Sequence, residues 1–382
     1  MENRCSVACA EIDSLREEIF MILVLRPEEI DGLITMKEAI EVVREGFIEW
    51  NKHPDFSEVR HRTHVPSNVR VSVHQGGLPK IGVTGLMTHC EWTKNPTKGG
   101  HSIEAFPVRG RPVQVLFDAE NGELRCLIIG EPKPKELSLS GVSALRTAAN
   151  SAVGTDVFAR KNAESIGILG SQNQARYHLI ALREIRKIKR VKVYSPNPQH
   201  RKDFADEMGS LLNIEVRPVE SAEAAVKGVD IVVAATSSNV PVLDGRWLEP
   251  GVHLTSIVVS NIGLKRGGFV PKMRQELDDE SMRRAEVIGV NSRETIRVDQ
   301  PGDFVERLEK GIISWEKLVE VGEVLNGVKP GRTRDDQITL FKNTGGVGIS
   351  DVAIGGRLYR LAKEKGLGLE LPIDGAEWRE PL

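Results

Sequence analysis

The spacing of hydrophobic residues in the first third of the chain changes from a helical to a strand-like period. Between residues 35 and 50 the apolar positions recur three to four residues apart, with Thr35 in front of them as a helix N-cap. These positions are Ala39, Val42, Val43, Phe47 and Ile48. From residue 60 to 130, short apolar runs are cut by glycine, proline and asparagine, and Asn121-Gly122 separates two of them as a hairpin turn would. This region is therefore predicted to be mostly antiparallel sheet.

The second half of the chain alternates short apolar runs with helical stretches. A helix rich in small residues, "VSALRTAANSAVGTDVFA", precedes the apolar runs "SIGILG", "RVKVYSP", "EVRPV", "DIVVAAT" and "HLTSIVVS". Strands and helices that alternate at this spacing predict a parallel sheet with helices on both faces, which binds its ligand at the carboxyl ends of the strands. The predicted fold class is α/β, with a Rossmann-type doubly wound parallel sheet and a second, mostly antiparallel α+β domain.

Composition and charge argue against several classes of function. The 382 residues are 40% hydrophobic and 28% charged, with a formal net charge of -2, so neither nucleic acid nor an anionic membrane is expected as a partner. No run approaches the roughly 18 apolar residues of a membrane span. Residues 1–20 lack the apolar core of a signal peptide and are interpreted as a flexible extension before Met21. The cysteines lack metal-ligand spacing, so we expect no metal site and reduced thiols in a cytoplasmic protein; they are Cys5, Cys9, Cys90 and Cys126.

The stretch "SIGILGSQNQARYH" has the form of a dinucleotide-binding turn with one unusual residue. In a Rossmann turn the first glycine makes the bend, the second lets the pyrophosphate approach the backbone, and the third lets the helix pack on the strand. Gly170 and Ala175 fill the first and third roles, but Gln172 stands at the second, where its Cβ disfavours a positive φ. The N–H groups at the start of the helix still favour a phosphate, with further side-chain donors at Ser171, Gln172 and Asn173. The alternative is a small-residue turn of any α/β domain.

The end of the next strand, "VKVYSPNPQHR", bears on the choice of dinucleotide. An acidic residue for a ribose 2′-hydroxyl is missing there, and Ser195 and Asn197 stand in its place, followed by His200 and Arg201. Small polar groups followed by a cation suit a 2′-phosphate, so NADP is slightly favoured over NAD. The alternative is that Arg201 belongs to the solvated first turn of a helix.

Several ordered segments together resemble the ornithine cyclodeaminase/mu-crystallin family, from about residue 21 to the C-terminus. They are "LFDAENGELRCLI", "ALRTAANSAVGTDVFA", "IGILGSQNQARYH", "DIVVAATSSNVPVLDGRWLEPGVHLTSI", "EVLNGVKPGR" and "DQITLFKNTGGVGISDVA". The resemblance implies a homodimer of two-domain subunits, with a substrate-binding and dimerisation domain beside the Rossmann domain. It also implies a nicotinamide cofactor and one of the family's activities, which include ornithine cyclodeamination, alanine dehydrogenation and ketimine reduction.

The same resemblance implies roles for particular residues. Arg146 would hold the substrate carboxylate, for which a guanidinium fork is suited, and Thr147 would contact the cofactor. Arg62 is the candidate for a second carboxylate-binding arginine, with Arg60 and Arg70 as rivals. The pyrophosphate turn would comprise Gly170, Ser171, Gln172, Gln174 and Ala175, and the nicotinamide side would be lined by Thr236, Ser237 and Ser238.

Three positions depart from the family pattern. Besides Gln172 in the glycine loop, Thr84 falls where the family has a substrate-site lysine, and Asn261 falls where cyclodeaminases have an aspartate. An amide cannot take a proton or activate water as a carboxylate can, so Asn261 argues against cyclodeamination without excluding redox chemistry. Losing the lysine removes a cation from the substrate site. The basic stretch 263–275 is a further candidate for shaping the pocket.

His89 is the candidate proton donor for an imine nitrogen. The segment "LMTHCEW" places His89 and Glu91 on one side of a strand, and a histidine titrates near neutral pH. A buried structural histidine is the more common alternative, and a metal site of His74, His89 and Glu91 is a weaker one.

The function predicted from the sequence is an NAD(P)-dependent oxidoreductase that acts on a small carboxylate-bearing substrate. It would reduce an imine or a 2-oxo acid/amine adduct, or run the reverse amino-acid dehydrogenation. The alternatives are a cyclodeaminase-like ammonia lyase and a non-catalytic dimeric ligand-binding protein. The Rossmann domain is predicted at 147–345, and the other domain at 21–146 together with 346–382.

Overall fold

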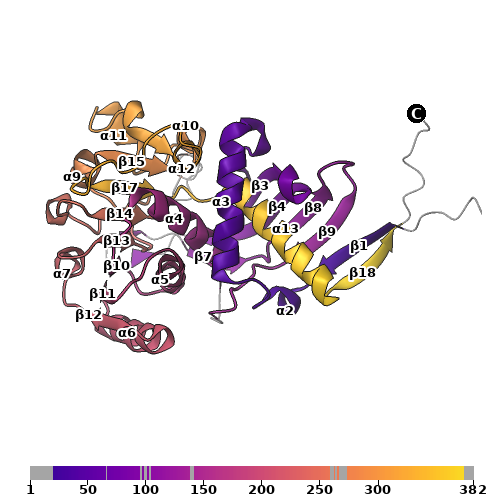
Figure 1. Cartoon of the computed structure of the whole chain (residues 1–382), viewed down its shortest axis with the longest axis horizontal. Helices are drawn as coiled ribbons and strands as arrows, with labels where there is room; N and C mark the ends of the chain where they lie inside the picture. The colour runs from indigo at the N-terminus through magenta and orange to yellow at the C-terminus, as the bar shows by residue number, and fades with distance from the viewer. Residues whose placement is uncertain are drawn as a thin grey trace, which may run out of the picture.

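The computed structural model describes residues 20–65, 67–94, 97–98, 101–102, 105–137, 142–258, 262, 265 and 273–373. Residues 1–19 of the predicted extension 1–20, Asn261 and most of the 263–275 stretch lie outside the described residues, and Phe20 is already the first residue of a strand. Two eight-stranded sheets lie at opposite ends of the molecule, with α3, α4 and α13 between them (Figure 1). The predicted α/β class is confirmed.

The first sheet is antiparallel except where its first strand joins it. Its order is β18-β1-β9-β8-β4-β3-β2, with β7 also paired to β4, and only β1 and β9 run parallel among its pairs. The β8–β9 hairpin turns at Gly122, whose φ of 76° fits the predicted turn. The strands are β1 (Phe20–Leu25), β2 (His61–Val65), β3 (Val69–Leu78), β4 (Val83–Lys94), β7 (Ala105–Arg109), β8 (Val113–Asp118), β9 (Leu124–Ile129) and β18 (Leu369–Ile373), and a separate ladder joins β5 (Thr97–Lys98) and β6 (His101–Ser102).

The second sheet is parallel throughout, in the order β12-β11-β10-β13-β14-β17-β15-β16. The chain passes from β10 outward to β12 and then returns to β13 on the other side of β10. The strand order therefore reverses between β10 and β13, which is where doubly wound folds bind dinucleotides. The strands are β10 (Ser165–Leu169), β11 (Arg190–Tyr194), β12 (Glu215–Pro218), β13 (Ile231–Ala234), β14 (His253–Ser256), β15 (Val287–Val290), β16 (Leu318–Glu320) and β17 (Thr339–Lys342).

Helix α3 (Met36–Lys52) begins where the sequence predicts, at a capping box between Thr35 and Glu38. Helix α13 (Gly348–Lys365) ends at Gly366, whose φ of 63° suits a helix C-cap. The remaining helices are α2 (Pro27–Ile30), α4 (Leu145–Phe158), α5 (Asn173–Ile185), α6 (Pro198–Leu212), α7 (Ala222–Val226), α9 (Asp279–Arg284), α10 (Arg293–Asp299), α11 (Val305–Glu309) and α12 (Val321–Leu325). Short 3-10 helices are η2 (Pro54–Phe56), η3 (Pro79–Ile81), η4 (Gly245–Trp247) and η5 (Trp315–Lys317).

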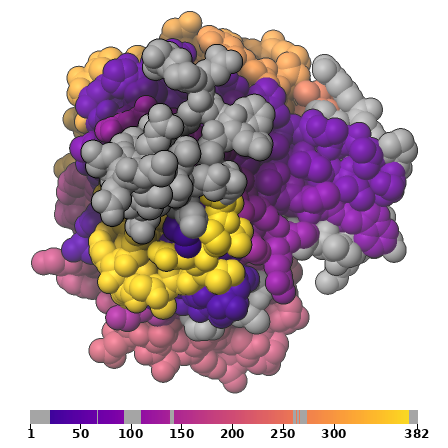
Figure 2. All heavy atoms as spheres, turned by 90° about the vertical axis from the view of Figure 1, so that its right-hand side faces the viewer, coloured from indigo at the N-terminus to yellow at the C-terminus, as the bar shows by residue number. Residues whose placement is uncertain are grey.

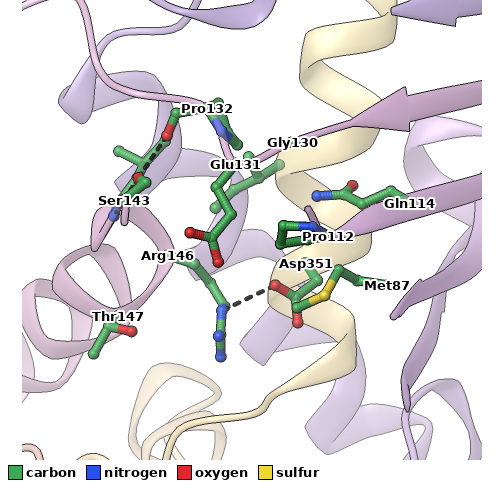
Figure 3. A pocket seen from close by; sticks show the side chains of 12 residues that line it. Met87, Pro112, Gln114, Gly130, Glu131, Pro132, Ser143, Arg146, Thr147 and Asp351 are labelled. Carbon is green, nitrogen blue, oxygen red and sulfur yellow. Dashed lines mark hydrogen bonds and ion pairs between the residues drawn. The ribbon is translucent and has the colours of Figure 1, made fainter. Parts of the chain in front are cut away.

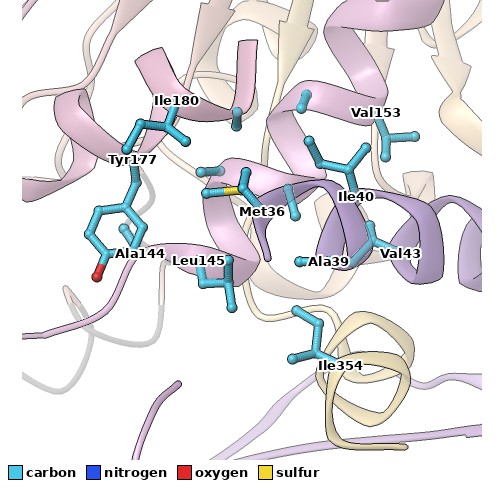
Figure 4. Packing of buried hydrophobic residues seen from close by; sticks show 14 of the residues in the cluster. Met36, Ala39, Ile40, Val43, Ala144, Leu145, Val153, Tyr177, Ile180 and Ile354 are labelled. Atoms are coloured by element: carbon cyan, nitrogen blue, oxygen red, sulfur yellow. The ribbon is translucent and has the colours of Figure 1, made fainter. Parts of the chain in front are cut away.

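One hydrophobic core runs through the junction of the two sheets. Ile40 and Val43 of α3, Leu145 and Val153 of α4, and Ile354 of α13 belong to the same buried cluster (Figure 4). The small residues of α4 allow this close packing: a Cβ added at Gly154 would lie 2.4 Å from the ring of Phe341. A large apolar junction holds the relative placement of two domains. This shared core therefore fixes α4 and α13 against the antiparallel sheet.

The opposite face of the antiparallel sheet leaves large apolar side chains in contact with solvent. Val65, Val71 and Trp92 are 42%, 37% and 41% exposed. Figure 2 views the molecule from the right-hand end of Figure 1, where β1 and β18 of this sheet lie. Among the described residues, no helix has the length and apolar character needed to cross a membrane.

Candidate active site

A cavity lies where the first turn of α4 meets α13 and the antiparallel sheet (Figure 3). Arg146 and Thr147 enter it from α4, and Asp351 enters it from α13. Its other walls are Met87, Pro112, Gln114, Gly130, Glu131, Pro132, Ser143, Leu145 and Ile354. The cavity therefore presents one guanidinium and two carboxylates at the junction of the two sheets.

Asp351 orients the guanidinium of Arg146. Its Oδ1 lies 2.9 Å from Arg146 Nε, and its Oδ2 lies 2.9 Å from His74 Nδ1. Arg146 Nη1 is buried without a hydrogen-bond partner, whereas Nε is fully occupied. An unpaired buried donor costs free energy, and an anionic ligand that accepted a hydrogen bond from Arg146 Nη1 would remove that cost.

His74 is a neutral hydrogen-bond donor to Asp351. The residue is 3% exposed, and burial lowers its pKa to about 4 although the carboxylate of Asp351 opposes that shift. A neutral imidazole that bonds a carboxylate through Nδ1 carries its proton there. Sequence reasoning assigned His74 only to a weak metal alternative and did not single out Asp351. His74 and Asp351 are connected to Arg146 only because β3 packs against α13 in the folded protein.

The predicted proton donor His89 lies next to this group on β4. Its ring meets that of His74 edge-on at 5.6 Å, and its Nε2 lies 3.5 Å from Glu91 Oε1. Glu91 Oε2 in turn accepts a 2.7 Å hydrogen bond from Arg70 Nε. These residues share one sheet face because His74 pairs with Met87, Ser72 with His89 and Arg70 with Glu91. Among the described residues, no group of three or more ligand-type side chains is placed to hold a metal ion.

Thr84 lies on the other face of the same sheet. It is three positions before Met87 on β4 and pairs with Gly77, so its side chain points away from the cavity. Its hydroxyl donates to the carbonyl of Gly76 at 3.2 Å. The structure does not bring Thr84 together with Arg146.

Arg62 and Arg60 share one carboxylate across the junction of the sheets. Asp299 at the end of α10 lies 3.0 Å from Arg62 Nη1 and 2.6 Å from Arg60 Nη2. Burial, together with the charges of Arg60 and Arg70, lowers the pKa of Arg62 to about 9. An excess of positive charge therefore surrounds this end of β2 and β3, although each arginine has a carboxylate partner.

The glycine turn accommodates Gln172 without backbone strain. Gln172 has a φ of −96° and is exposed, so the position where a family glycine was expected needs no positive φ. Gly170 does need one, at 113°, and a Cβ there would lie 2.2 Å from the carbonyl oxygen of Ala235. Ala175 is fully buried where the helix packs on the sheet. The bend and the packing of a dinucleotide turn are thus both present.

The side chains around this turn serve different purposes. Arg176 donates to the carbonyl of Ser171 and pairs with Glu207 at 2.7 Å, which supports the turn from the helix side. Asn173 Nδ2 lies 3.4 Å from the carbonyl of Val142, just before α4. Gln174 Oε1 is buried without a hydrogen-bond partner, an acceptor that a ligand donor would satisfy.

His178 links the Gly170 turn to the cavity that Arg146 and Thr147 line. Its Nδ1 lies 2.7 Å from the carbonyl of Gln174, and its Nε2 lies 2.8 Å from Ser151 Oγ on α4. Asn343 then donates both to Ser151 Oγ at 3.0 Å and to the carbonyl of Thr147 at 2.9 Å. Burial lowers the pKa of His178 to about 4, so the ring is neutral. Its Nδ1 then donates to the carbonyl of Gln174, and its Nε2 accepts from the hydroxyl of Ser151.

The residues at the end of β11 are already engaged with one another. Asn197 caps α6 by accepting from the backbone N–H of Gln199 at 2.9 Å. Arg201 is buried, donates to the carbonyl of Ser195 at 3.1 Å and pairs with the exposed Glu220. A 2′-phosphate at this position would therefore compete with Glu220 for the guanidinium.

Thr236, Ser237 and Ser238 follow β13, beside the point where the strand order reverses. Thr236 donates through N and Oγ1 to Glu276 at 2.6 and 2.8 Å. Ser237 is exposed, and Ser238 donates to the carbonyl of Val240 at 2.7 Å. Glu276 was not predicted as a site residue, because it lies 40 residues from Thr236 in sequence.

Comparisons with known proteins agree with this architecture. The chain is 30% identical to a solved structure of the Thermococcus litoralis Δ1-pyrroline-2-carboxylate reductase in complex with NADH and L-proline, covering 92% of this chain and 100% of that one, with a TM-score of 0.76. It is 27% identical to an archaeal alanine dehydrogenase dimer with bound NAD, with 92% and 99% coverage and a TM-score of 0.75. It is 29% identical over 338 residues to the ketimine reductase mu-crystallin of Mus musculus, covering 88% of this chain and 96% of the relative.

The model of the ornithine cyclodeaminase/mu-crystallin family matches residues 22–366, which is most of the chain and includes every residue of the candidate site. The sequence segments that suggested this family lie within that match. The chain therefore belongs to the ornithine cyclodeaminase/mu-crystallin family.

Proposed function

We propose that the protein is an NAD(P)-dependent oxidoreductase that reduces the C=N bond of a small imino acid or catalyses the reverse oxidation of an amino acid. The observation that carries this proposal is Arg146, whose buried Nη1 has no partner while Asp351 fixes its Nε at 2.9 Å. A guanidinium held in one orientation with a free donor is suited to a substrate carboxylate. The relatives named for pyrroline-2-carboxylate, ketimine and alanine chemistry support the same substrate class.

The proposed cofactor is a nicotinamide dinucleotide bound along the carboxyl ends of β10, β13 and β14. The positive φ of Gly170 and the uncapped start of α5 at Gln172 suit a pyrophosphate. The dinucleotide supplies or accepts the hydride, and the protein supplies orientation and charge. The residues proposed to hold it are Thr147, Gly170, Ser171, Gln172, Asn173, Gln174, Ala175, Ser195, Asn197, Arg201, Thr236, Ser237 and Ser238. The slight preference for NADP stays a proposal, since Arg201 is paired with Glu220.

His89 is proposed to donate the proton to the nitrogen of the reduced substrate. It lies on the sheet face that carries Met87 of the cavity wall, and Glu91 holds one side of its ring at 3.5 Å. His74 separates it from Asp351, so Asp351 can orient Arg146 without contacting His89. Arg62 is proposed as a second cation near the substrate carboxylate, which it would reach by exchanging its bond to Asp299.

Two alternatives are weaker. Cyclodeamination needs a carboxylate where Asn261 stands, a residue outside the described part of the chain. A non-catalytic binding protein is less well supported, because the relatives are named as reductases and a dehydrogenase. We further propose a homodimer formed through the exposed apolar face that carries Val65, Val71 and Trp92. The domain boundaries proposed are 147–345, and 21–146 with 346–382.

The decisive experiment titrates the purified protein with NADH and NADPH, following tryptophan quenching and nicotinamide emission. Oxidation of the tighter cofactor is then measured with Δ1-pyrroline-2-carboxylate and with pyruvate plus ammonia. Turnover of either substrate is expected and supports the proposal. Ammonia release from ornithine without net change in cofactor would favour cyclodeamination instead. Absence of dinucleotide binding at millimolar concentration would refute the oxidoreductase.

A further inference from the structure

Glu276 is a fully buried carboxylate at the carboxyl ends of β13 and β14. Its Oε1 accepts the two hydrogen bonds from Thr236, at 2.6 Å from N and 2.8 Å from Oγ1. Its Oε2 accepts from Ser256 Oγ at 2.8 Å, Ile257 N at 3.1 Å and Val258 N at 3.0 Å. One side chain thus joins the starts of the two loops that follow these central strands.

All five hydrogen bonds to Glu276 come from donors, two hydroxyl and three N–H groups. Thr236 Oγ1 accepts from Ser238 N at 3.1 Å, and Ser256 Oγ accepts from Lys342 Nζ at 2.7 Å. Both hydroxyl protons are therefore directed at Glu276, and its other three partners are N–H groups. A protonated carboxyl would place its hydrogen against a donor, whereas a carboxylate satisfies all five.

Lys342 holds the second loop from its other side. Its side chain is fully buried, donates to the carbonyl of Val258 at 2.7 Å and pairs with Asp303 at 2.7 Å. Glu276 therefore fixes residues 256–258 through the hydroxyl of Ser256 and the N–H groups of Ile257 and Val258, and Lys342 fixes them through the carbonyl of Val258. Charged groups at zero exposure are costly unless they are paired or hydrogen-bonded, and both Glu276 and Lys342 meet that condition here.

Both loops lie beside the point where the strand order reverses between β10 and β13. A dinucleotide at such a point has its adenosine half over β10 and β11 and its nicotinamide half over β13 and β14. We propose that Glu276 is a positioning residue for the nicotinamide half of the cofactor, acting through the loops that begin at Thr236 and Ile257. This inference rests on the proposed function, since it requires a dinucleotide in the site.

The test compares two ligands that share the adenosine half, NADH and ADP-ribose, which lacks nicotinamide. Glu276→Gln places an amide N–H₂ against donors and displaces at least one loop, so the Kd of NADH should rise about tenfold or more. The Kd of ADP-ribose should change by less than about twofold, because the turn at Gly170 is untouched. Glu276→Asp keeps the charge and should recover part of the loss. If NADPH is the tighter cofactor, it is compared with 2′-phospho-ADP-ribose.

Ser256→Ala and Thr255→Val provide a second variant and a matched control. Ser256→Ala removes one of the five hydrogen bonds and tests the inference even if Glu276→Gln fails to fold. Thr255 is the buried neighbour on β14, but its hydroxyl lies 2.9 Å from Thr155 Oγ1 on α4. Its substitution should leave the ratio of the two dissociation constants unchanged.

A purely structural role would give a different result. If the Glu276 and Ser256 variants weaken NADH and ADP-ribose by the same factor, or weaken neither, the inference is wrong while the proposed function stands. If the unmodified protein binds neither ligand at millimolar concentration, the proposed function fails and the inference fails with it. A selective loss of NADH affinity supports both.

Discussion

Asp351 holds Arg146 through Nε at 2.9 Å and leaves the buried Nη1 of the same guanidinium without a partner. The two residues lie on different helices, α13 and α4, which the common core fixes in place. The guanidinium is therefore oriented before any ligand arrives, and binding need not supply that ordering.

Replacing Arg146 should weaken substrate binding much more than cofactor binding. In Arg146→Lys the charge remains but the fork that bonds both Asp351 and a carboxylate is lost. We expect KM for the imino acid to rise about 10- to 100-fold, the range of one charge-assisted hydrogen bond of about 1.5–3 kcal/mol, with the Kd of the dinucleotide within about twofold. Steady-state kinetics and cofactor titration check this. An equal loss in both quantities would place Arg146 outside the substrate site.

Asp351→Asn should separate orientation of the arginine from its charge. The amide can still accept from Arg146, but it cannot match the carboxylate that serves both Arg146 and His74 at 2.9 Å. We expect a smaller rise in KM than for Arg146→Lys, with folding retained. Arg44→Gln is a suitable control, because Arg44 does not line the cavity. Its Nη2 lies 2.7 Å from Asp156 Oδ2. An unchanged KM in Asp351→Asn would show that Arg146 needs no orientation.

Gln172→Gly should not tighten cofactor binding appreciably. The φ of Gln172 is −96°, so glycine relieves no strain, and its extra freedom must be lost on folding. We expect the Kd of NADH to change by less than about threefold and the stability to fall by about 0.5–1 kcal/mol at most. A tenfold gain in affinity would show that the Gln172 side chain obstructs the pyrophosphate.

Gly170→Ala is the matched variant in the same turn. Gly170 has a φ of 113°, and a Cβ there lies 2.2 Å from a backbone oxygen. Both the strain and the collision push the turn away from β13, so dinucleotide binding should be lost or the fold destabilised. Circular dichroism and cofactor titration distinguish the two results.

The sequence was sufficient for the elements but not for the contacts between them. The period of the apolar residues placed α3 and the strands of the parallel sheet, and the family motifs placed Arg146 and the glycine turn. Thr84 and His89 differ by an odd number of residues on one strand and therefore face opposite sides, which the alternation of a strand dictates once its bounds are known.

Residues that act through long-range contacts were missed for a physical reason. Asp351 reaches His74 across 277 positions, and Glu276 reaches Thr236 across 40, so no local pattern links them. Asp351 stands as one charge in the apolar stretch "VGISDVAIGG", whereas Glu276 stands among other charged residues in "RQELDDE". Burial of a charge becomes informative only when its partners are known.

The preference between NADH and NADPH should depend on the pair Arg201 and Glu220. The exposed Glu220 forms an ion pair with the guanidinium of Arg201. Glu220→Gln removes this pair and leaves Arg201 able to bind a 2′-phosphate. We expect Glu220→Gln to lower the Kd of NADPH relative to NADH by about 3- to 10-fold and Arg201→Ala to reverse that change. Fluorescence titration of both cofactors measures it. If neither variant alters the ratio, the 2′ position lies elsewhere.

The stability of the protein should fall as the pH drops below the ordinary histidine range. Burial lowers the pKa of both His74 and His178 from 6.5 to about 4, and that of His253 falls well below 6.5. Between pH 6.5 and 4 the unfolded chain therefore binds protons that the folded chain does not bind. The stability that these neutral histidines contribute is fully present above pH 6.5 and decreases as the pH falls from 6.5 to 4. Each of the first two histidines contributes about 3 kcal/mol at most to this loss.

His178→Gln tests this linkage without changing a residue that lines the cavity at Arg146. The amide keeps a donor and an acceptor for the carbonyl of Gln174 and the hydroxyl of Ser151 but does not titrate. Urea unfolding at several pH values between 7 and 4.5 measures the free energy of unfolding. This free energy should fall less steeply with decreasing pH in the variant, because one proton fewer is taken up on unfolding. His61→Gln serves as the control, because the His61 side chain is 69% exposed. Identical slopes for the unmodified protein and His178→Gln would mean that His178 becomes protonated in the folded state, which its two buried hydrogen bonds do not allow without breaking one of them.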